Sequence, residues 1–424
     1  MGFSFIHIAD IHLGRQFSGL SKYSNDEKVK SLCKKGVEQS FNNFINFAID
    51  KKVNFVLIAG DTFDSSEQDL ESKLILKSGL VKLQNAGIKV FLICGNHDPL
   101  SSYNKNTFDF DENSIVKIVG LNSTVQASFQ VEDYAKIHAI SFENVEFRQN
   151  PAELLSQLNI EDKKLFNIGL IHCDLNADKN SVYAPCSVSD LKALNYNYWA
   201  LGHIHLPNSF DENIFYSGTL QGRNTKETGT HGFRYIQVEN NKIISNEFIN
   251  SDVIRYEDID IDLSDTNNTI SAYDKIIENI DNKIEIKQAE LYLVRVNLIG
   301  SVNYLSEIND KFYSFIAEKI KDEYSDKICV STFYNNLIAK VDEQSLKEDK
   351  GIVGEIYNVL QQDENIILSF DSVQKQLKSI ISSCDFSKDE FEILKKEIVS
   401  ETKEKCLDIC NIVYNNENSE AINE

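Results

Sequence analysis

Short apolar runs alternate with longer amphipathic stretches through the first half of the chain. Runs at 5–10, 53–61 and 88–98 end in polar residues, and helix-like stretches at 26–51 and 67–86 separate them. Two more runs (166–175 and 196–205) and a segment that resembles strands joined by Gly-rich loops (213–238) follow. Continuous apolar strands alternating with amphipathic helices are typical of βαβ units around a buried sheet. The pattern predicts an α/β fold with its sites at the carboxyl ends of the strands.

The character of the sequence changes near residue 250. Residues 253–265 alternate apolar and acidic side chains, as a half-exposed strand does. Further strands and helices are predicted at 269–282 (helix), 290–300 (strand), 303–323 (helix) and 328–335 (strand). Periodic apolar positions then predict helices at 351–362, 370–382 and 388–413. Three regions are therefore expected: 1–250, a small α+β domain at 251–340, and a helical region at 341–424.

Composition places the chain among globular proteins. Its 424 residues are too many for one small domain, and 42% are hydrophobic and 25% charged. No run approaches about 18 apolar residues, and no basic segment followed by an apolar one opens the chain. The eight cysteines lack paired spacing, which favours reduced thiols over a disulfide framework. A cytoplasmic protein is expected.

The net charge of −22 argues against a surface covered with basic residues for nucleic acid. The acidity is unevenly distributed, however. Residues 1–250 carry 24 basic and 29 acidic side chains, whereas 251–424 carry 19 and 36. A catalytic first half that handles phosphates remains compatible with the composition.

Polar motifs follow five of the apolar runs. They are Asp10-x-His12, Gly60-Asp61, Gly95-Asn96-His97-Asp98, His172 and Gly202-His203-x-His205. Residues two apart in an extended segment point to the same side. Asp10 with His12, and His203 with His205, can therefore each present both side chains to one pocket. Carboxylate, imidazole and amide donors suit Mn²⁺, Fe²⁺ or Zn²⁺. Two ions about 3.5–4 Å apart need a shared carboxylate, and Asp61 is the natural bridge. Each motif alone is common in ordinary loops. The inference of a metal site therefore rests on all five motifs occurring together, each after an apolar run.

This ordered series resembles the calcineurin-like metallophosphoesterase superfamily over about residues 3–240. The segments "FIHIADIHLG", "AGDTFD" and "CGNHDP" are most similar to the Mre11/SbcD DNA-repair nucleases, and "YSGTLQGRNTKETGTHGF" to their bacterial YhaO-like branch. The resemblance implies a four-layer β-sandwich flanked by helices, with 251–340 as a capping domain. It also implies a homodimer through the helices near 26–51 and 67–86, and an SMC/Rad50-like ATPase bound by the C-terminal helices. For these last helices, a helical cap packed on its own protein is an open alternative.

The resemblance also implies roles for individual residues. One divalent ion would be held by Asp10, His12, Asp61 and His205, and a second by Asp61, Asn96, His172 and His203. The ions are expected to be Mn²⁺, with Mg²⁺, Fe²⁺ and Zn²⁺ open. His97 would be the general acid, and Asp98 is expected to orient it.

Other polar residues have weaker assignments. Some family members have a histidine where this chain has Asp64, so no DNA-handling role transfers to that position. His7 and His138 lie inside apolar strands and are expected to be structural. Arg15, Arg223 and His231 are candidates for the pocket rim, where an arginine could pair with a substrate phosphate. A plain surface role for Arg223 is also open.

The expected activity is metal-dependent hydrolysis of DNA phosphodiesters, exonucleolytic or endonucleolytic, in repair or defence. One alternative is a phosphodiesterase acting on small nucleotides, or a phosphoprotein phosphatase. Another is a scaffold that kept the fold and lost its metals. Every expected ligand position holds a suitable residue, which favours an enzyme.

Overall fold

The computed structural model describes residues 2–15, 17, 27–65, 67–103, 114–121, 124–158, 164–177, 180–286, 288–340 and 343–361. The chain divides into two compact units. The first comprises Met1–Asp258, Glu285–Val294 and Lys321–Ser331. The second comprises Ile259–Ile284, Arg295–Ile320 and Thr332–Glu424.

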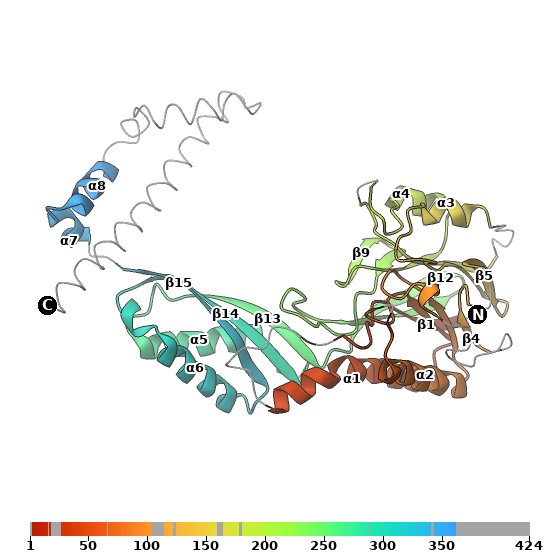
Figure 1. Ribbon diagram of the computed structural model, residues 1–424, viewed down its shortest axis with the longest axis horizontal. Coiled ribbons are helices and arrows are strands. Elements are labelled where there is room, and N and C mark those ends of the chain that lie inside the picture. The colour runs from red at the N-terminus through yellow and green to blue at the C-terminus, as the bar shows by residue number, and fades with distance from the viewer. Residues whose placement is uncertain are drawn as a thin grey trace, which may run out of the picture. The chain divides into compact units, whose positions relative to one another are not determined.

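Two six-stranded sheets stack face to face in the first unit (Figure 1). The first sheet has the order β12-β11-β1-β2-β3-β4. Its strands are β1 (Gly2–Ile8), β2 (Phe55–Ala59), β3 (Lys89–Ile93), β4 (Val116–Ile118), β11 (Gly232–Glu239) and β12 (Lys242–Asn250). Strands β1 to β4 run parallel, and β11 pairs antiparallel with β1. The parallel strands therefore end at the same edge of the sheet.

The second sheet has the order β5-β6-β7-β8-β10-β9. Its strands are β5 (Gln126–Val131), β6 (Ala135–Ile140), β7 (Phe166–His172), β8 (Tyr198–Gly202), β9 (Asn208–Asp211) and β10 (Ile214–Tyr216). Strands β6, β7 and β8 are parallel neighbours. No strand was predicted at β5, which lacks a continuous apolar run and has mostly partly or fully exposed residues.

Helices cover the outer faces of both sheets. The helices α1 (Glu27–Lys51) and α2 (Leu70–Asn85) lie on the first sheet, where Phe41, Phe44 and Leu80 form a core with the strands. The helices α3 (Pro151–Ser156) and α4 (Val188–Ala193) lie outside the second sheet, and a short 3₁₀ helix spans Leu100–Ser102. The four layers, helix–sheet–sheet–helix, confirm the predicted α/β sandwich.

A second core fills the space between the sheets. Phe5 and Phe55 of the first sheet pack with Ile168 and Tyr198 of the second. All five residues of β2 are buried, because helices cover one face of its sheet and the second sheet covers the other. That double burial explains why the predicted strands are continuously apolar instead of alternating.

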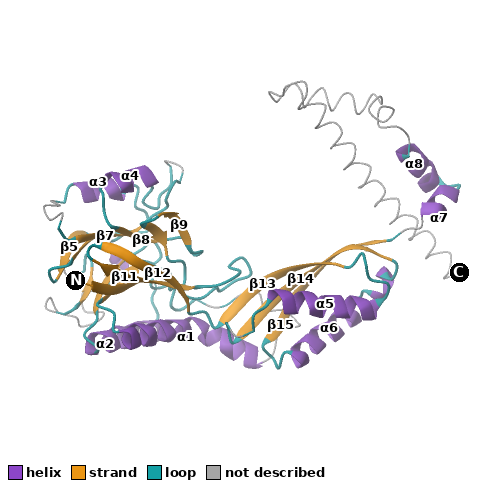
Figure 2. Cartoon of the chain, turned by 180° about the vertical axis from the view of Figure 1, so that it is seen from behind, coloured by secondary structure: helices purple, strands orange, loops and turns teal. Residues whose placement is uncertain are grey.

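A third sheet, with the order β13-β14-β15, runs through both units. Its strands are β13 (Ile254–Asp262), β14 (Leu291–Val302) and β15 (Ile328–Ala339). The helices α5 (Thr269–Lys283) and α6 (Asp310–Glu323) lie along it (Figure 2), and a 3₁₀ helix spans Leu305–Glu307. The predicted β-α-β-α-β order is confirmed.

The first unit includes the parts of β13, β14 and β15 that lie outside the second unit. Ile254 and Leu291 pack with Val29 of α1 and with Cys329, so the near ends of β13, β14 and β15 belong to the first unit. The predicted helical tail contributes α7 (Glu343–Glu348) and α8 (Ile352–Leu360). The helices predicted at 370–382 and 388–413 lie outside the described residues. Within the described chain, none of the helices combines the length and apolar character that a membrane span requires.

Candidate metal centre

The seven predicted ligands converge from both sheets of the first unit. Strands β1, β2 and β3 of the first sheet lead to one group of them, and β7 and β8 of the second sheet lead to the other. The first group is Asp10, His12, Asp61 and Asn96, and the second group is His172, His203 and His205. The structure thus brings together residues that are up to 195 positions apart in the sequence.

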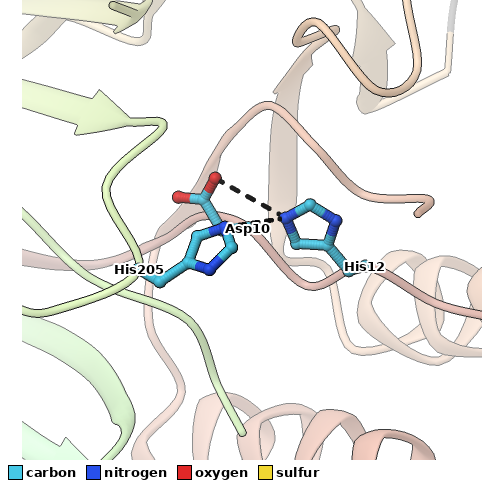
Figure 3. A group of neighbouring side chains, drawn as sticks. All are labelled: Asp10, His12 and His205. Atoms are coloured by element: carbon cyan, nitrogen blue, oxygen red, sulfur yellow. Dashed lines mark hydrogen bonds and ion pairs between the residues drawn. The ribbon is translucent and has the colours of Figure 1, made fainter. Parts of the chain in front are cut away.

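Asp10, His12 and His205 form one potential ion position (Figure 3). The two imidazoles approach closely, with 3.2 Å between His12 Nε2 and His205 Nε2. The His12 Nε2 atom lies 4.0 Å from Asp10 Oδ1 and 3.9 Å from Asp61 Oδ2. Two nitrogen atoms and two carboxylates around one point are a suitable donor set for a divalent cation.

Asn96, His172 and His203 form the second potential position. The Asn96 Oδ1 atom lies 3.0 Å from His172 Nε2 and 3.2 Å from His203 Nδ1. The His172 Nε2 atom is 3.4 Å from Asp61 Oδ2. Asp61 therefore faces both groups, which is the placement expected of a bridging ligand.

Hydrogen bonds on the outer nitrogen of three imidazoles fix which nitrogen faces inward. The Nδ1–H of His172 donates to the Ala59 carbonyl at 2.9 Å. The Nδ1–H of His12 donates to Asp64 Oδ1 at 3.1 Å, and that of His205 donates to Glu227 Oε1 at 2.7 Å. In each neutral ring Nε2 then carries a lone pair directed into the centre. The facing lone pairs of His12 and His205 would repel each other without a cation between them, so the residues present fit a bound ion.

Burial and charge set suitable protonation states. Burial lowers the pKa of His12 and of His203 to about 3, so both imidazoles are neutral. Burial alone would raise the pKa of Asp61, but His172 and His12 outweigh it and hold the pKa below its usual range. Burial also disfavours charge on His172, yet the Asp61 carboxylate raises its pKa to about 9. The His172 proton balances Asp61 in the protein alone, and a divalent ion would supply that positive charge instead.

The backbone at the ligands is left-handed. The φ angles are 51° at Asp10, 49° at His12, 49° at Asp61 and 109° at His203. Such conformations cost non-glycine residues roughly 1–3 kcal/mol each and persist where the surroundings enforce them. Here the His203 N–H donates to both Asp10 carboxylate oxygens, at 3.1 and 3.0 Å. The expectation that Asp10 and His12 converge because the chain is extended is therefore wrong: they converge because the backbone turns after β1 ends.

Two glycines allow the loops to approach each other closely. A Cβ atom at Gly95 would lie 2.2 Å from Asp61 Oδ1, and one at Gly202 would lie 1.8 Å from the Ala59 carbonyl oxygen. Neither contact is possible, so a side chain at either position would displace Asp61 or the loop after β2. The Gly-Asn-His-Asp and Gly-His-x-His motifs need glycine for this steric reason.

His97 lies beside the centre. Its backbone N–H donates to Asp61 Oδ1 at 2.9 Å, and its Nδ1–H donates to the Asp64 carbonyl at 2.7 Å. The ring centroid is 4.8 Å from that of His12, and the residue is partly exposed. Since Nδ1–H is engaged with the backbone, a proton on Nε2 is the one that His97 can deliver to a substrate.

Asp98, predicted to orient His97, makes its hydrogen bonds with other groups. Its carboxylate accepts hydrogen bonds from the backbone N–H groups of Thr62, at 2.9 Å, and Gly95, at 2.9 Å, and from the Tyr103 hydroxyl, at 3.0 Å. Asp98 therefore ties the loop after β2 to the loop after β3. None of these hydrogen bonds involves the His97 ring. Burial raises its pKa to about 7.

The structure places Arg223 and His231 inside the protein, although both were predicted to line a pocket rim. Both side chains are fully buried, and Arg223 pairs with Glu227. Arg15 is partly exposed and its Nη1–H donates to Asp64 at 3.0 Å. His7 contacts the Tyr198 hydroxyl and the Leu201 carbonyl, and His138 contacts Asn167. These contacts agree with the structural roles predicted for His7 and His138.

Two residues at the centre were not predicted. Asp64 was considered only as a departure from the family pattern, and Glu227 lies unremarked within the Gly-rich loop. Asp64 contacts His12 and Glu227 contacts His205. The position of Asp64, three residues after the predicted ligand Asp61, could have indicated that it lies near the metal centre. Nothing in the sequence connects Glu227 with His205, 22 residues away.

Comparison with known proteins identifies the family. The family model "Calcineurin-like phosphoesterase" matches residues 3–207. A Bacillus subtilis (strain 168) protein named "Uncharacterized metallophosphoesterase YhaO" is 30% identical over 304 residues, which are 70% of this chain and 72% of that protein.

Two proteins named "DNA double-strand break repair protein Mre11" are also similar. The one from Sulfurisphaera tokodaii is 28% identical over 206 residues, which are 47% of this chain and 48% of that protein. The one from Methanocaldococcus jannaschii is 24% identical over 303 residues, covering 66% of this chain and 74% of that protein. Since the family model covers the strands that carry all seven ligands, and one relative is similar over most of both chains, this chain belongs to the calcineurin-like metallophosphoesterase family.

Proposed function

We propose that this protein is a two-metal phosphodiesterase that hydrolyses DNA, with Mn²⁺ as its ion. The observation that carries the proposal is the arrangement around Asp61. This one carboxylate faces two sets of ion donors, and the partly exposed imidazole of His97 lies beside it. The relatives named Mre11 are described as DNA double-strand break repair proteins, which supports DNA as the substrate.

The residues present supply the parts that phosphodiester hydrolysis needs. Two divalent ions, when bound, would activate a water and neutralise the charge that develops on the phosphoryl oxygens. Asp10, His12, Asp61 and His205 would hold one ion, and Asp61, Asn96, His172 and His203 the other. His97 donates the Nε2 proton to the departing alcohol oxygen, and its Nδ1–H bond to the Asp64 carbonyl keeps the ring oriented.

A cavity beside the centre has four basic and three acidic residues in its lining, and the basic ones support a polyanionic substrate. The cavity has a volume of about 590 Å³ and extends from Arg15, next to the Asp-x-His motif, along the first half of α1. Lys30, Lys34, Lys35 and Glu38 of α1 line it, together with Asp69, which caps α2, and Glu71 of α2. All three lysines are exposed. Although the whole chain is acidic, these basic side chains could contact the phosphates of a bound DNA backbone.

The experiment compares DNA with a small diester. Wild-type protein with Mn²⁺ is expected to degrade end-labelled duplex or single-stranded DNA, and also to cleave bis(p-nitrophenyl) phosphate. The Lys30→Gln/Lys34→Gln variant should bind DNA more weakly but cleave the small diester at the wild-type rate. Because each phosphate contact releases counterions, the slope of log affinity against log salt should fall by about one for each lysine removed.

The matched control is Lys51→Gln/Lys52→Gln, which removes two exposed lysines at the other end of α1. This variant should keep wild-type DNA binding. If the wild type spares DNA while cleaving the small diester, the nuclease proposal fails. If both double variants bind DNA equally well, the lysines of the cavity do not contact the substrate.

A further inference from the structure

The two imidazoles at the first ion position share an unusual outer environment. Behind His12, Asp64 Oδ1 accepts from His12 Nδ1–H at 3.1 Å and from Arg15 Nη1–H at 3.0 Å. Behind His205, Glu227 Oε1 accepts from His205 Nδ1–H at 2.7 Å and from Arg223 Nη2–H at 3.2 Å. Each imidazole is therefore backed by a carboxylate oxygen that an arginine also holds.

The second ion position is built differently. The outer nitrogen of His172 donates to the neutral carbonyl of Ala59. His203 uses Nδ1 to face Asn96 directly. Among the described residues, the arginine–carboxylate arrangement thus occurs only behind His12 and His205. A carboxylate behind an imidazole makes the ring a stronger donor and fixes its orientation, which a neutral carbonyl does less effectively.

The two carboxylates differ in burial. The Arg223 side chain is 0% exposed and that of Glu227 10%, whereas those of Arg15 and Asp64 are 37% and 29% exposed. Glu227 is also held through its other oxygen, which accepts from the Arg223 backbone N–H at 2.7 Å. Solvent screens the Arg15–Asp64 pair more strongly, so Glu227 should exert the larger effect on its histidine.

The guanidinium of Arg223 lies within hydrogen-bonding distance of both His205 and Glu227. Its Nη2 atom lies 2.9 Å from His205 Nδ1 as well as 3.2 Å from Glu227 Oε1. If Nδ1 accepted from the guanidinium, the neutral ring would carry its proton on Nε2 and could not bind an ion. The short 2.7 Å contact with Glu227 instead favours Nδ1–H as the donor. Glu227 thus keeps Nε2 of His205 free for a metal, and Arg223 holds Glu227 in place.

We infer that Glu227 and Asp64, each held by its arginine, are positioning residues for a single ion position, the one formed by Asp10, His12, Asp61 and His205, with Glu227 the more important. Neither residue contacts the reacting atoms, and the second ion position does not depend on them. The inference rests on the metal centre and not on DNA as the substrate.

The test measures Mn²⁺ binding and needs no substrate. Wild-type protein should bind two Mn²⁺ ions by calorimetry and show the spin-coupled pair by electron paramagnetic resonance. Glu227→Gln should weaken one of the two binding events by about 10–100-fold and leave the other unchanged. A mononuclear Mn²⁺ signal should then appear at concentrations where the wild type shows the coupled pair. Asp64→Asn should shift the same event by a smaller factor.

Controls separate positioning from folding. Glu212→Gln removes an exposed carboxylate at the turn between β9 and β10 and should leave both binding events unchanged. Glu227→Asp keeps the charge and should recover part of the lost affinity, which a purely structural role of the Glu227 side-chain length would not predict. If folded Glu227→Gln and Asp64→Asn bind both ions with wild-type affinity, the inference is wrong. It is equally wrong if Glu227→Gln and Glu227→Asp weaken both ions to the same extent. Because the readout is ion binding, a failure of the nuclease proposal would not affect this result.

Discussion

Replacing His97 with alanine is expected to lower kcat on DNA by about 10²–10⁴-fold, the usual contribution of a general acid, without loss of either ion. The imidazole is the group beside the ion donors that can protonate a departing alcohol. Its contact with Asp61 is made by the backbone N–H, so that contact survives the substitution. The measurement is single-turnover cleavage of end-labelled DNA, with Mn²⁺ binding recorded in parallel.

The dependence on the leaving group provides the control for His97. A p-nitrophenolate leaves without protonation, so His97→Ala should cleave bis(p-nitrophenyl) phosphate at close to the wild-type rate. An equal loss on both substrates would contradict the role of a general acid and would instead indicate that His97 supports the ion ligands.

Asp61→Asn is expected to abolish binding of the Mn²⁺ pair and with it hydrolysis of both substrates. The Asp61 carboxylate lies near donors of both positions, at 3.9 Å from His12 Nε2 and 3.4 Å from His172 Nε2. The loss of Mn²⁺ affinity should exceed the roughly 10–100-fold loss that follows removal of a hydrogen-bond partner behind a ligand. Asparagine tolerates the left-handed φ of 49° at this position, and its amide oxygen can still accept from the His97 N–H.

Equilibrium dialysis with metal analysis measures this effect. Asp50→Asn, an exposed change at the end of α1, is the control and should retain two ions. Retention of two ions by Asp61→Asn would rule out the bridging assignment. Retention of a single ion would show that Asp61 serves one position only.

The elements that position the centre could be predicted because their signals are local. A buried parallel strand is a continuous apolar run, and the loop that follows it stands out by its polarity, as in the segment that ends at Asp61. The structural role predicted for His7 also rested on a local signal, its position inside an apolar strand, and its side chain contacts Tyr198 of the second sheet. Strand β5 lacks such a signal because its pairing with β6 leaves several of its side chains exposed.

The environment behind the ligands could not be predicted in this way. The contact between Glu227 and His205 depends on how the Gly-rich loop folds back, which composition and periodicity do not encode. Arg223 was expected at the pocket rim because it lies in the Gly-rich loop, but its side chain is buried and pairs with Glu227. Asp98 was assigned to its neighbour His97, but it bonds to backbone N–H groups of two loops instead. In each case the tertiary contacts differ from those that the residue type or its neighbours in the sequence suggest.

The origin of the ligands from two sheets affects the order of events during folding. Asp10 and Asp61 extend from one sheet and His172 and His205 from the other, so neither sheet alone offers a complete donor set. The unfolded chain keeps these residues far apart and offers no preformed site. We therefore expect metal uptake to follow the docking of the two layers, with a bound ion cross-linking them. Loss of the ion should therefore raise amide hydrogen exchange first at the carboxyl ends of β1, β2, β7 and β8, while the opposite edge of the sandwich stays protected.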